Sequence, residues 1–137
     1  MTAKFVNSQS TFEHTINTEV QEVSFDIIES NTGSFYLAGY ESDDSHDGFN
    51  GIIYKINSEG EIIKKKNINY QSGNVFLFDI LEITKSRYLF FGCKQSDTSE
   101  LYDLLILDID SALNVLQKWT YPTQFNSRIH FLKSVKT

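Results

Sequence analysis

Apolar residues along the chain fall into short runs that polar turns separate. The first runs follow one another closely, with Asn31 to Ser34 and Ser58 to Gly60 as turns and Glu41 to Asn50 as a polar loop. The Asn and Gly residues of these turns tolerate positive φ. The run that starts at Gly51 is almost continuously apolar, as expected of a strand buried on both faces. The pattern therefore predicts four antiparallel strands, at Val23 to Glu29, Phe35 to Tyr40, Gly51 to Asn57 and Glu61 to Asn69.

The same pattern returns 53 residues later. The segment Phe25-Asp26-Ile27-Ile28-Glu29 recurs as Phe78-Asp79-Ile80-Leu81-Glu82, and in each copy the next strand ends in glycine, at Gly39 and Gly92. A fixed period of this length indicates a repeat architecture. Tyr102 to Leu116 could also be read as a helix, but its β-branched residues and central Asp-Ile-Asp favour a strand followed by a turn. We therefore expect strands and little helix.

We interpret residues 1–137 as one β-repeat domain. Residues 23–70 form the first repeat and residues 75–123 the second. Residues 1–20 resemble the closing hairpin of a preceding repeat, and residues 127–137 start a third copy, with Phe131 placed 53 residues after Phe78. In equivalent positions of the two sheets, six apolar residues are predicted to be buried: Phe25, Phe78, Ile53, Ile106, Ile56 and Ile109.

Two motifs of each repeat are similar to those of bacterial β-propellers. In the first copy they are Tyr36-Leu37-Ala38-Gly39 and Ile53-Tyr54-Lys55-Ile56-Asn57-Ser58-Glu59-Gly60. The second copy supplies Leu89-Phe90-Phe91-Gly92 and Ile106-Leu107-Asp108-Ile109-Asp110, and has Leu113 in place of the turn glycine. The chain resembles the delta-60 or SBBP-type repeats. The resemblance implies an all-β fold of antiparallel four-stranded, β-propeller-like blades, two of them complete and two partial.

Composition and charge narrow the range of functions. The aromatic content of 14% favours β structure, and the net charge of −6 argues against binding to nucleic acid or to anionic lipid. No run approaches the roughly 18 apolar residues of a membrane span, and the first residues lack the apolar core of a signal peptide. The compartment stays open between the cytoplasm and secretion after processing. Cys93 is the single cysteine, which excludes an intrachain disulfide.

Two pairs of residues are candidate ligand-binding positions. Asp26 and Asp79 could face a central channel and bind a cation or a polar ligand. The interpretation that we favour is that each accepts a hydrogen bond from the backbone of a neighbouring blade, because a residue repeated in every blade usually serves the architecture. Trp119 and Tyr121 could form an aromatic platform for a ligand, or could seal adjacent blades.

The polar loop is a candidate calcium site. Asp43, Ser45 and Asp47 offer oxygens at alternate positions, and a glycine follows. No glutamate closes the loop, so we interpret it as solvated, with Ca²⁺ as the alternative and no other cofactor. Lys64-Lys65-Lys66 could be a basic patch, but lysines on an outer strand more often discourage edge-to-edge pairing.

These features favour a non-catalytic module of the β-propeller type for protein or ligand recognition, and not an enzyme. One alternative is a carbohydrate-binding, lectin-like protein; another is a hydrolase that uses Asp26 and Asp79 in a channel. The partner would be a protein or a glycan. Two repeats are too few to close a ring. We therefore expect a homo-oligomer of about six blades from two chains, or a part of a larger propeller, with a compact sandwich as the remaining alternative.

Overall fold

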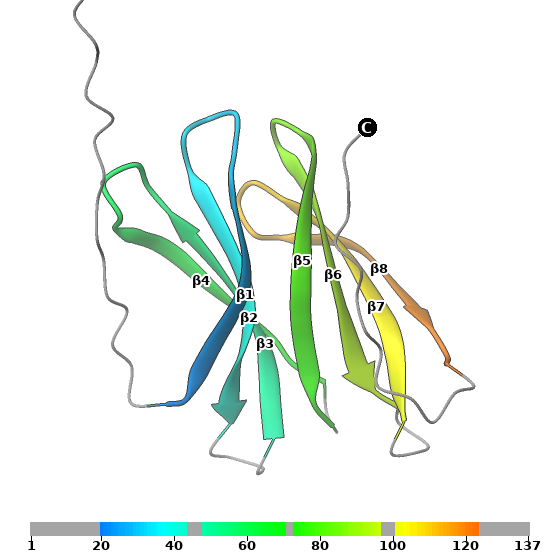
Figure 1. The fold of residues 1–137 in the computed structure, drawn as a ribbon. Helices are drawn as coiled ribbons and strands as arrows, with labels where there is room; N and C mark the ends of the chain where they lie inside the picture. Colours follow the sequence, from blue (N-terminus) through cyan, green and yellow to red (C-terminus); the bar gives the residue numbers. More distant parts are fainter. Residues whose placement is uncertain (1–19, 44–47, 71–72, 97–100, 124–137) are drawn as a thin grey trace, which may run out of the picture.

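The computed structural model of the chain describes residues 20–43, 48–70, 73–96 and 101–123. These residues form eight antiparallel strands and no helix, in two separate four-stranded sheets (Figure 1). The prediction of an all-β, antiparallel fold is confirmed for this part of the chain. No helix that could cross a membrane is found among these residues. The proposed strands of residues 1–20 and 127–137 lie outside the described residues, apart from Val20.

Each sheet is a simple meander in which every strand pairs with the next one along the chain. Sheet 1 consists of β1 (Glu22–Glu29), β2 (Phe35–Asp43), β3 (Gly48–Ile56) and β4 (Ile62–Ile68). Sheet 2 consists of β5 (Val75–Thr84), β6 (Arg87–Gln95), β7 (Tyr102–Asp110) and β8 (Val115–Tyr121).

Two features of the strand pattern differ from expectation. The polar loop from Glu41 to Asn50 is shorter than predicted, because Glu41 pairs with Asn50 and Asp43 with Gly48 as β2 and β3 continue into it. The backbone hydrogen bonds between the strands of a hairpin do not require apolar side chains. A prediction based on side-chain polarity alone therefore ended these two strands too early. The segment considered as a helix is a strand, β7, followed by a turn.

The two sheets share a bulge in their first strands at the offset of 53 residues. The β1–β2 register shifts between Ser24 and Asp26, and the β5–β6 register shifts between Leu77 and Asp79. Each bulge brings the first strand very close to a glycine of the second. A Cβ added at Gly39 would lie 2.0 Å from the carbonyl oxygen of Val23, and one added at Gly92 would lie 2.1 Å from that of Phe76. The aromatic motif therefore ends in glycine in both sheets because any side chain there would collide with the backbone of the first strand.

The turns after the third strands also correspond. The Asn57 side-chain oxygen accepts hydrogen bonds from the backbone N–H groups of Glu59 and Glu61. The Asp110 carboxylate does the same for Ala112 and Asn114, 53 positions later. Such side-chain-to-backbone bonds hold a tight turn in place.

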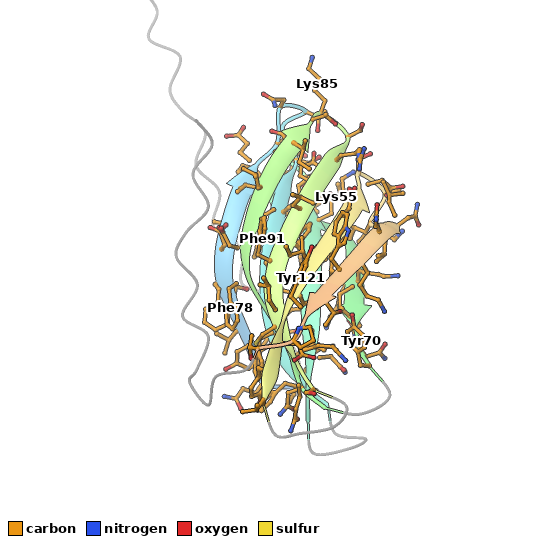
Figure 2. All side chains as sticks on the ribbon, turned by 90° about the vertical axis from the view of Figure 1, so that its right-hand side faces the viewer. Lys55, Tyr70, Phe78, Lys85, Phe91 and Tyr121 are labelled. Atoms are coloured by element: carbon orange, nitrogen blue, oxygen red, sulfur yellow. The ribbon has the colours of Figure 1, made fainter. Side chains whose placement is uncertain are left out.

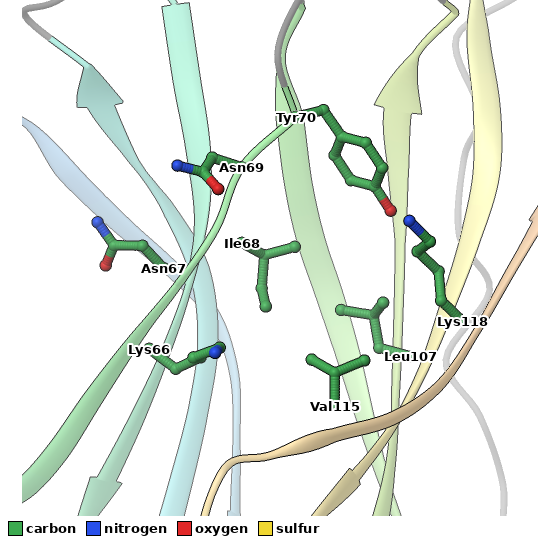
Figure 3. A pocket seen from close by; sticks show the side chains of 8 residues that line it. All are labelled: Lys66, Asn67, Ile68, Asn69, Tyr70, Leu107, Val115 and Lys118. Atoms are coloured by element: carbon green, nitrogen blue, oxygen red, sulfur yellow. The ribbon is translucent and has the colours of Figure 1, made fainter.

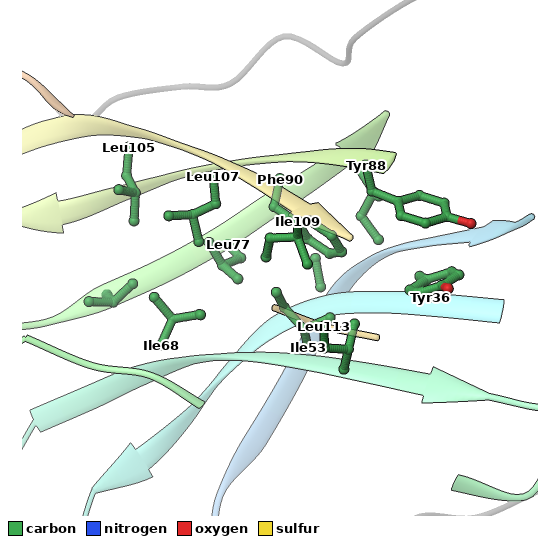
Figure 4. Close-up of a cluster of buried hydrophobic side chains, with 13 residues drawn as sticks. Tyr36, Ile53, Ile68, Leu77, Tyr88, Phe90, Leu105, Leu107, Ile109 and Leu113 are labelled. Atoms are coloured by element: carbon green, nitrogen blue, oxygen red, sulfur yellow. The ribbon is translucent and has the colours of Figure 1, made fainter. Parts of the chain in front are cut away.

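The sheets pack with opposite faces together. We call the face of sheet 1 that carries Tyr36, Ala38 and Ile53 its A face, and the face that carries Phe35, Leu37 and Tyr54 its B face; the faces of sheet 2 are named from the residues 53 positions later. The core between the sheets joins A-face residues of sheet 1 to B-face residues of sheet 2 (Figure 4). On the side of sheet 2 these are mainly Tyr88, Phe90, Leu105, Leu107 and Ile109.

Burial follows this packing and corrects one prediction. Ile53, Ile56 and Ile109 are buried as predicted, and Ile106 is partly buried. Phe25 was expected in the core but is 49% exposed, because it occupies the bulge of β1 at the edge of sheet 1. Its ring packs against Phe78, which is itself partly buried, with 5.0 Å between the ring centroids. The two phenylalanines therefore contact each other across the sheets and do not occupy separate, equivalent core positions.

Candidate functional site

The repeated aspartates meet where the first strands of the two sheets lie together. The Oδ2 atom of Asp26 in β1 accepts a hydrogen bond of 3.1 Å from the backbone N–H of Ile80 in β5. Ile80 is 4% exposed, so this bond supplies a partner to a buried donor. The contact corresponds to the architectural interpretation of Asp26, in which the carboxylate binds the backbone of the neighbouring sheet.

The Asp26 carboxyl also lies beside that of Asp79. Burial raises the pKa of Asp26, and hydrogen bonding and charge repulsion from Asp79 raise it further, while the Ile80 N–H acts in the opposite direction. The pair can therefore share a proton as neighbouring carboxyl groups do. Convergence of this kind is what the hydrolase alternative requires.

The surroundings of the pair offer little else for catalysis. A hollow of about 240 Å³ lies beside Asp26, and its other lining residues are Ser24, Phe25, Ile27 and Leu37. Asp79 is only 5% exposed, and one oxygen of Asp26 already binds backbone. In residues 20–43, 48–70, 73–96 and 101–123 no group of three His, Cys, Asp or Glu side chains could hold a metal ion. The arrangement suits a link between sheets better than a site for substrate.

A second link between the sheets is the turn between β7 and β8. The Lys55 ammonium group donates a hydrogen bond of 2.8 Å to the carbonyl oxygen of Ser111, and the Tyr36 hydroxyl donates one of 3.3 Å to the same atom. Lys64 donates to the carbonyl oxygen of Ala112 at 2.6 Å. Sequence reasoning missed these contacts, because a lysine in a strand is normally interpreted as facing solvent. A possible signal was Lys55, which interrupts an otherwise apolar run.

The B face of sheet 1 carries a polar network over a small apolar cluster. The cluster is formed by Ile52, Tyr54 and Ile56 with Phe35 and Leu37. The Tyr54 hydroxyl donates a hydrogen bond of 2.6 Å to Glu22. The Lys65 ammonium group donates to Glu22 at 2.9 Å and also to Glu41.

The charges of this network stabilise one another. Burial alone would lower the pKa of Lys65, but its hydrogen bonds to Glu41 and Glu22 outweigh burial and raise it. Burial likewise acts to raise the pKa of Glu22, and the bonds from Tyr54 and Lys65 lower it instead. Lys65, the middle lysine of the Lys64-Lys65-Lys66 run, is thus the cation of an ion-pair network with two glutamates and not part of a free basic patch.

The other predicted site residues do not join the aspartate pair. Trp119 and Tyr121 both lie on the A face of β8, and Tyr121 is 51% exposed. β8 and β5 are opposite edges of sheet 2, so Trp119 is three strand spacings, roughly 14 Å, from Asp79. Asp43 ends β2, while Ser45 and Asp47 of the candidate calcium loop lie outside the described residues.

Comparison with protein-family models found no match to the chain, and comparison with curated proteins found none either.

Proposed function

We propose that the chain is a non-catalytic scaffold or binding module made of β-propeller-type blades, which works by stacking its sheets against further sheets. The observation that carries this proposal is the head-to-tail packing, in which the A face of sheet 1 contacts the B face of sheet 2. In a two-layer sandwich each sheet turns one inner face to the other and leaves its outer face to solvent. Head-to-tail packing instead can be repeated in the same direction, because each sheet added presents the next A face.

The spacing of the sheets supports a radial arrangement. The first strand of sheet 2, β5, lies against β1, β2 and β3 of sheet 1. At the other side of the sheets, β4 and β8 border a groove (Figure 3). Sheets that are close at their first strands and apart at their last ones form a wedge, and wedges of this kind surround the axis of a propeller.

The two outer faces of this pair of sheets, the B face of sheet 1 and the A face of sheet 2, both carry apolar residues. On the B face of sheet 1, Ile27 is 56% exposed, close to the partly buried Leu37. On the A face of sheet 2, Phe91 and Ile106 are partly buried and Tyr121 is 51% exposed (Figure 2). A second copy that stacks its B face on this A face would cover both by the contact type already present within the chain, as in a heterologous interface.

Light scattering of the full chain at micromolar concentration tests this proposal. We expect a mass above the 15.8 kDa of one chain, which falls on dilution. Ile27→Asp places a charge on the B face of sheet 1, and Tyr121→Asp places one on the A face of sheet 2. Either variant alone should therefore be monomeric. A mixture of the two should form a heterodimer, because each variant keeps the face that the other has lost.

Ile83→Asp is the matched control, since Ile83 is 44% exposed near the β5–β6 turn. It should leave the mass of the assembly unchanged. A wild-type chain that is monomeric at every concentration, with the same stability after dilution, would contradict stacking between copies.

A further inference from the structure

A groove runs between the outer strands of the two sheets. It has a volume of about 410 Å³ and lies between the end of β4 and the strands β7 and β8 (Figure 3). The floor is apolar and consists of Ile68, Leu107 and Val115, of which Val115 is 40% exposed. The remaining lining residues are polar or aromatic: Lys66, Asn67, Asn69, Tyr70 and Lys118.

The charge of the groove is opposite to that of the chain. The chain carries −6, yet the lining includes two lysines and no carboxylate. Within the part of the chain that the structure describes, neither Lys66 nor Lys118 forms an ion pair. Tyr70 keeps Lys118 at the groove, with the ammonium nitrogen 4.7 Å from the centroid of its ring. An anionic group in the groove would therefore meet two cations that no carboxylate of the described residues pairs with.

The walls of the groove are also the edges of the sheets. Among the strands that the structure describes, β4 is the last of sheet 1 and β8 the last of sheet 2, so each has one side with no partner strand among them. Such an edge can accept an extended peptide as an additional strand. In the added strand every second side chain would point into the groove.

We propose that this groove binds an extended, acidic segment of a partner protein. Apolar side chains of the segment would cover the floor, its carboxylates would pair with Lys66 and Lys118, and its backbone would pair with the edge of β8. Asn69 can hydrogen-bond to a backbone group that the edge leaves unpaired. This site is separate from the stacking proposed above, because a single chain supplies both of its walls.

Fluorescence anisotropy with the full chain tests the groove. The probe is a labelled seven-residue peptide in which Thr alternates with Val or Glu, and the reference peptides carry Gln or Lys in place of Glu. We expect the Glu peptide to bind at least about fivefold more tightly than the Gln peptide and the Lys peptide not to bind measurably. Affinity for the Glu peptide should fall as salt is added, because the exposed pairs are screened.

Variants localise the binding. The double variant Lys66→Glu, Lys118→Glu should lose about tenfold or more in affinity, which corresponds to about 1.4 kcal/mol. Lys85→Glu reverses one charge at the β5–β6 turn, half of the charge change in the double variant and far from the groove, and should change affinity by less than about twofold (Figure 2). Lys66→Gln with Lys118→Gln repeats the test with a milder change, in case the double reversal affects folding. Slower amide hydrogen exchange in β8 on binding would show that the peptide pairs with this edge.

Several outcomes would overturn the proposal. Equal affinity for the Glu and Gln peptides would mean that the lysines do not select an acidic segment. A loss with Lys85→Glu as large as that with the groove variants would mean that net charge, and not the groove, attracts the peptide. Displacement of the peptide by millimolar succinate or by a sulfated polysaccharide, with no protection of β8, would assign the groove to another class of anion.

Discussion

Leu113 has the same left-handed backbone conformation as the turn glycine at the equivalent position of sheet 1, but its side chain is part of the core. Gly60 ends the β3–β4 turn with a φ of 87°, and Leu113, 53 residues later, has a φ of 62°. The resemblance to propeller repeats led us to regard a leucine here as a departure from the turn pattern. The structure shows the same left-handed backbone with the leucine side chain 1% exposed in the core between the sheets. The strain of the backbone is thus offset by burial of the side chain.

This balance predicts an unusual order of stabilities. Leu113→Ala removes the buried side chain and keeps the strain, so it should cost about 2–5 kcal/mol in the free energy of unfolding. Leu113→Gly removes the same side chain but relieves a left-handed conformation that costs roughly 1–2 kcal/mol. The glycine variant should therefore be the more stable of the two by about 1 kcal/mol in urea unfolding. An alanine variant that is equally or more stable would mean that the backbone at this turn is not strained.

Side chains at single positions were harder to predict than strands. Alternation identified the buried Ile53 and Ile109, because a strand shows its faces through its period of two. The alternation pattern gave the wrong burial for Phe25, because a bulge interrupts the period of two. In the sequence, the only sign of this bulge is the glycine on the neighbouring strand. Contacts such as Lys55 with Ser111 depend on how two sheets meet, which alternation within a strand does not contain.

At the scale of elements, Asp26 links the first strands of the two sheets. Its carboxylate accepts the Ile80 N–H and lies beside Asp79, so it takes part in one favourable and one unfavourable contact. From the sequence it could be predicted that the aspartates at these two equivalent positions serve the architecture. It could not be predicted that the two aspartates meet each other, since this requires the head-to-tail packing of the sheets.

Substitutions separate the two contacts. Asp26→Ala leaves the buried Ile80 N–H without an acceptor and should cost about 1–3 kcal/mol. Asp26→Asn keeps an oxygen for that N–H and removes the charge beside Asp79, so it should be more stable than the wild type at neutral pH. The folded pKa of Asp26 is raised, so the folded state binds more protons than the unfolded state between the two pKa values. The contribution of Asp26 to stability therefore falls as the pH rises through that range.

Urea unfolding at a series of pH values measures this effect. The advantage of Asp26→Asn should be present at neutral pH and disappear as the pH falls to the unfolded pKa of an aspartate, about 3.9. Asp79→Asn is the matched control, because it removes the same repulsion from the other side. If Asp26→Asn is as unstable as Asp26→Ala at neutral pH, the carboxylate charge itself holds the strands together and the repulsion is unimportant.

At the scale of the whole molecule, the two sheets share one core. The main cluster of buried residues takes Tyr36, Ala38, Ile53 and Ile68 from sheet 1 and the rest from sheet 2 and the segments beside it. A four-stranded sheet that buries one face mainly against its neighbour depends on that neighbour for its stability. We therefore expect both sheets to unfold together, although their hydrogen-bonded ladders are entirely separate.

The single tryptophan makes this testable, because Trp119 lies in β8 and reports on sheet 2 alone. Ile53→Ala removes a fully buried side chain from sheet 1 and should cost about 2–5 kcal/mol. If the sheets are one cooperative unit, Trp119 fluorescence and far-ultraviolet circular dichroism should give coincident transitions, both moved to lower urea concentration. Val115→Ala, at a position 40% exposed, should move them far less. A tryptophan transition that stays in place while the circular dichroism transition splits into two steps would mean that each sheet is stable alone, and stacking would then be an association of independent units.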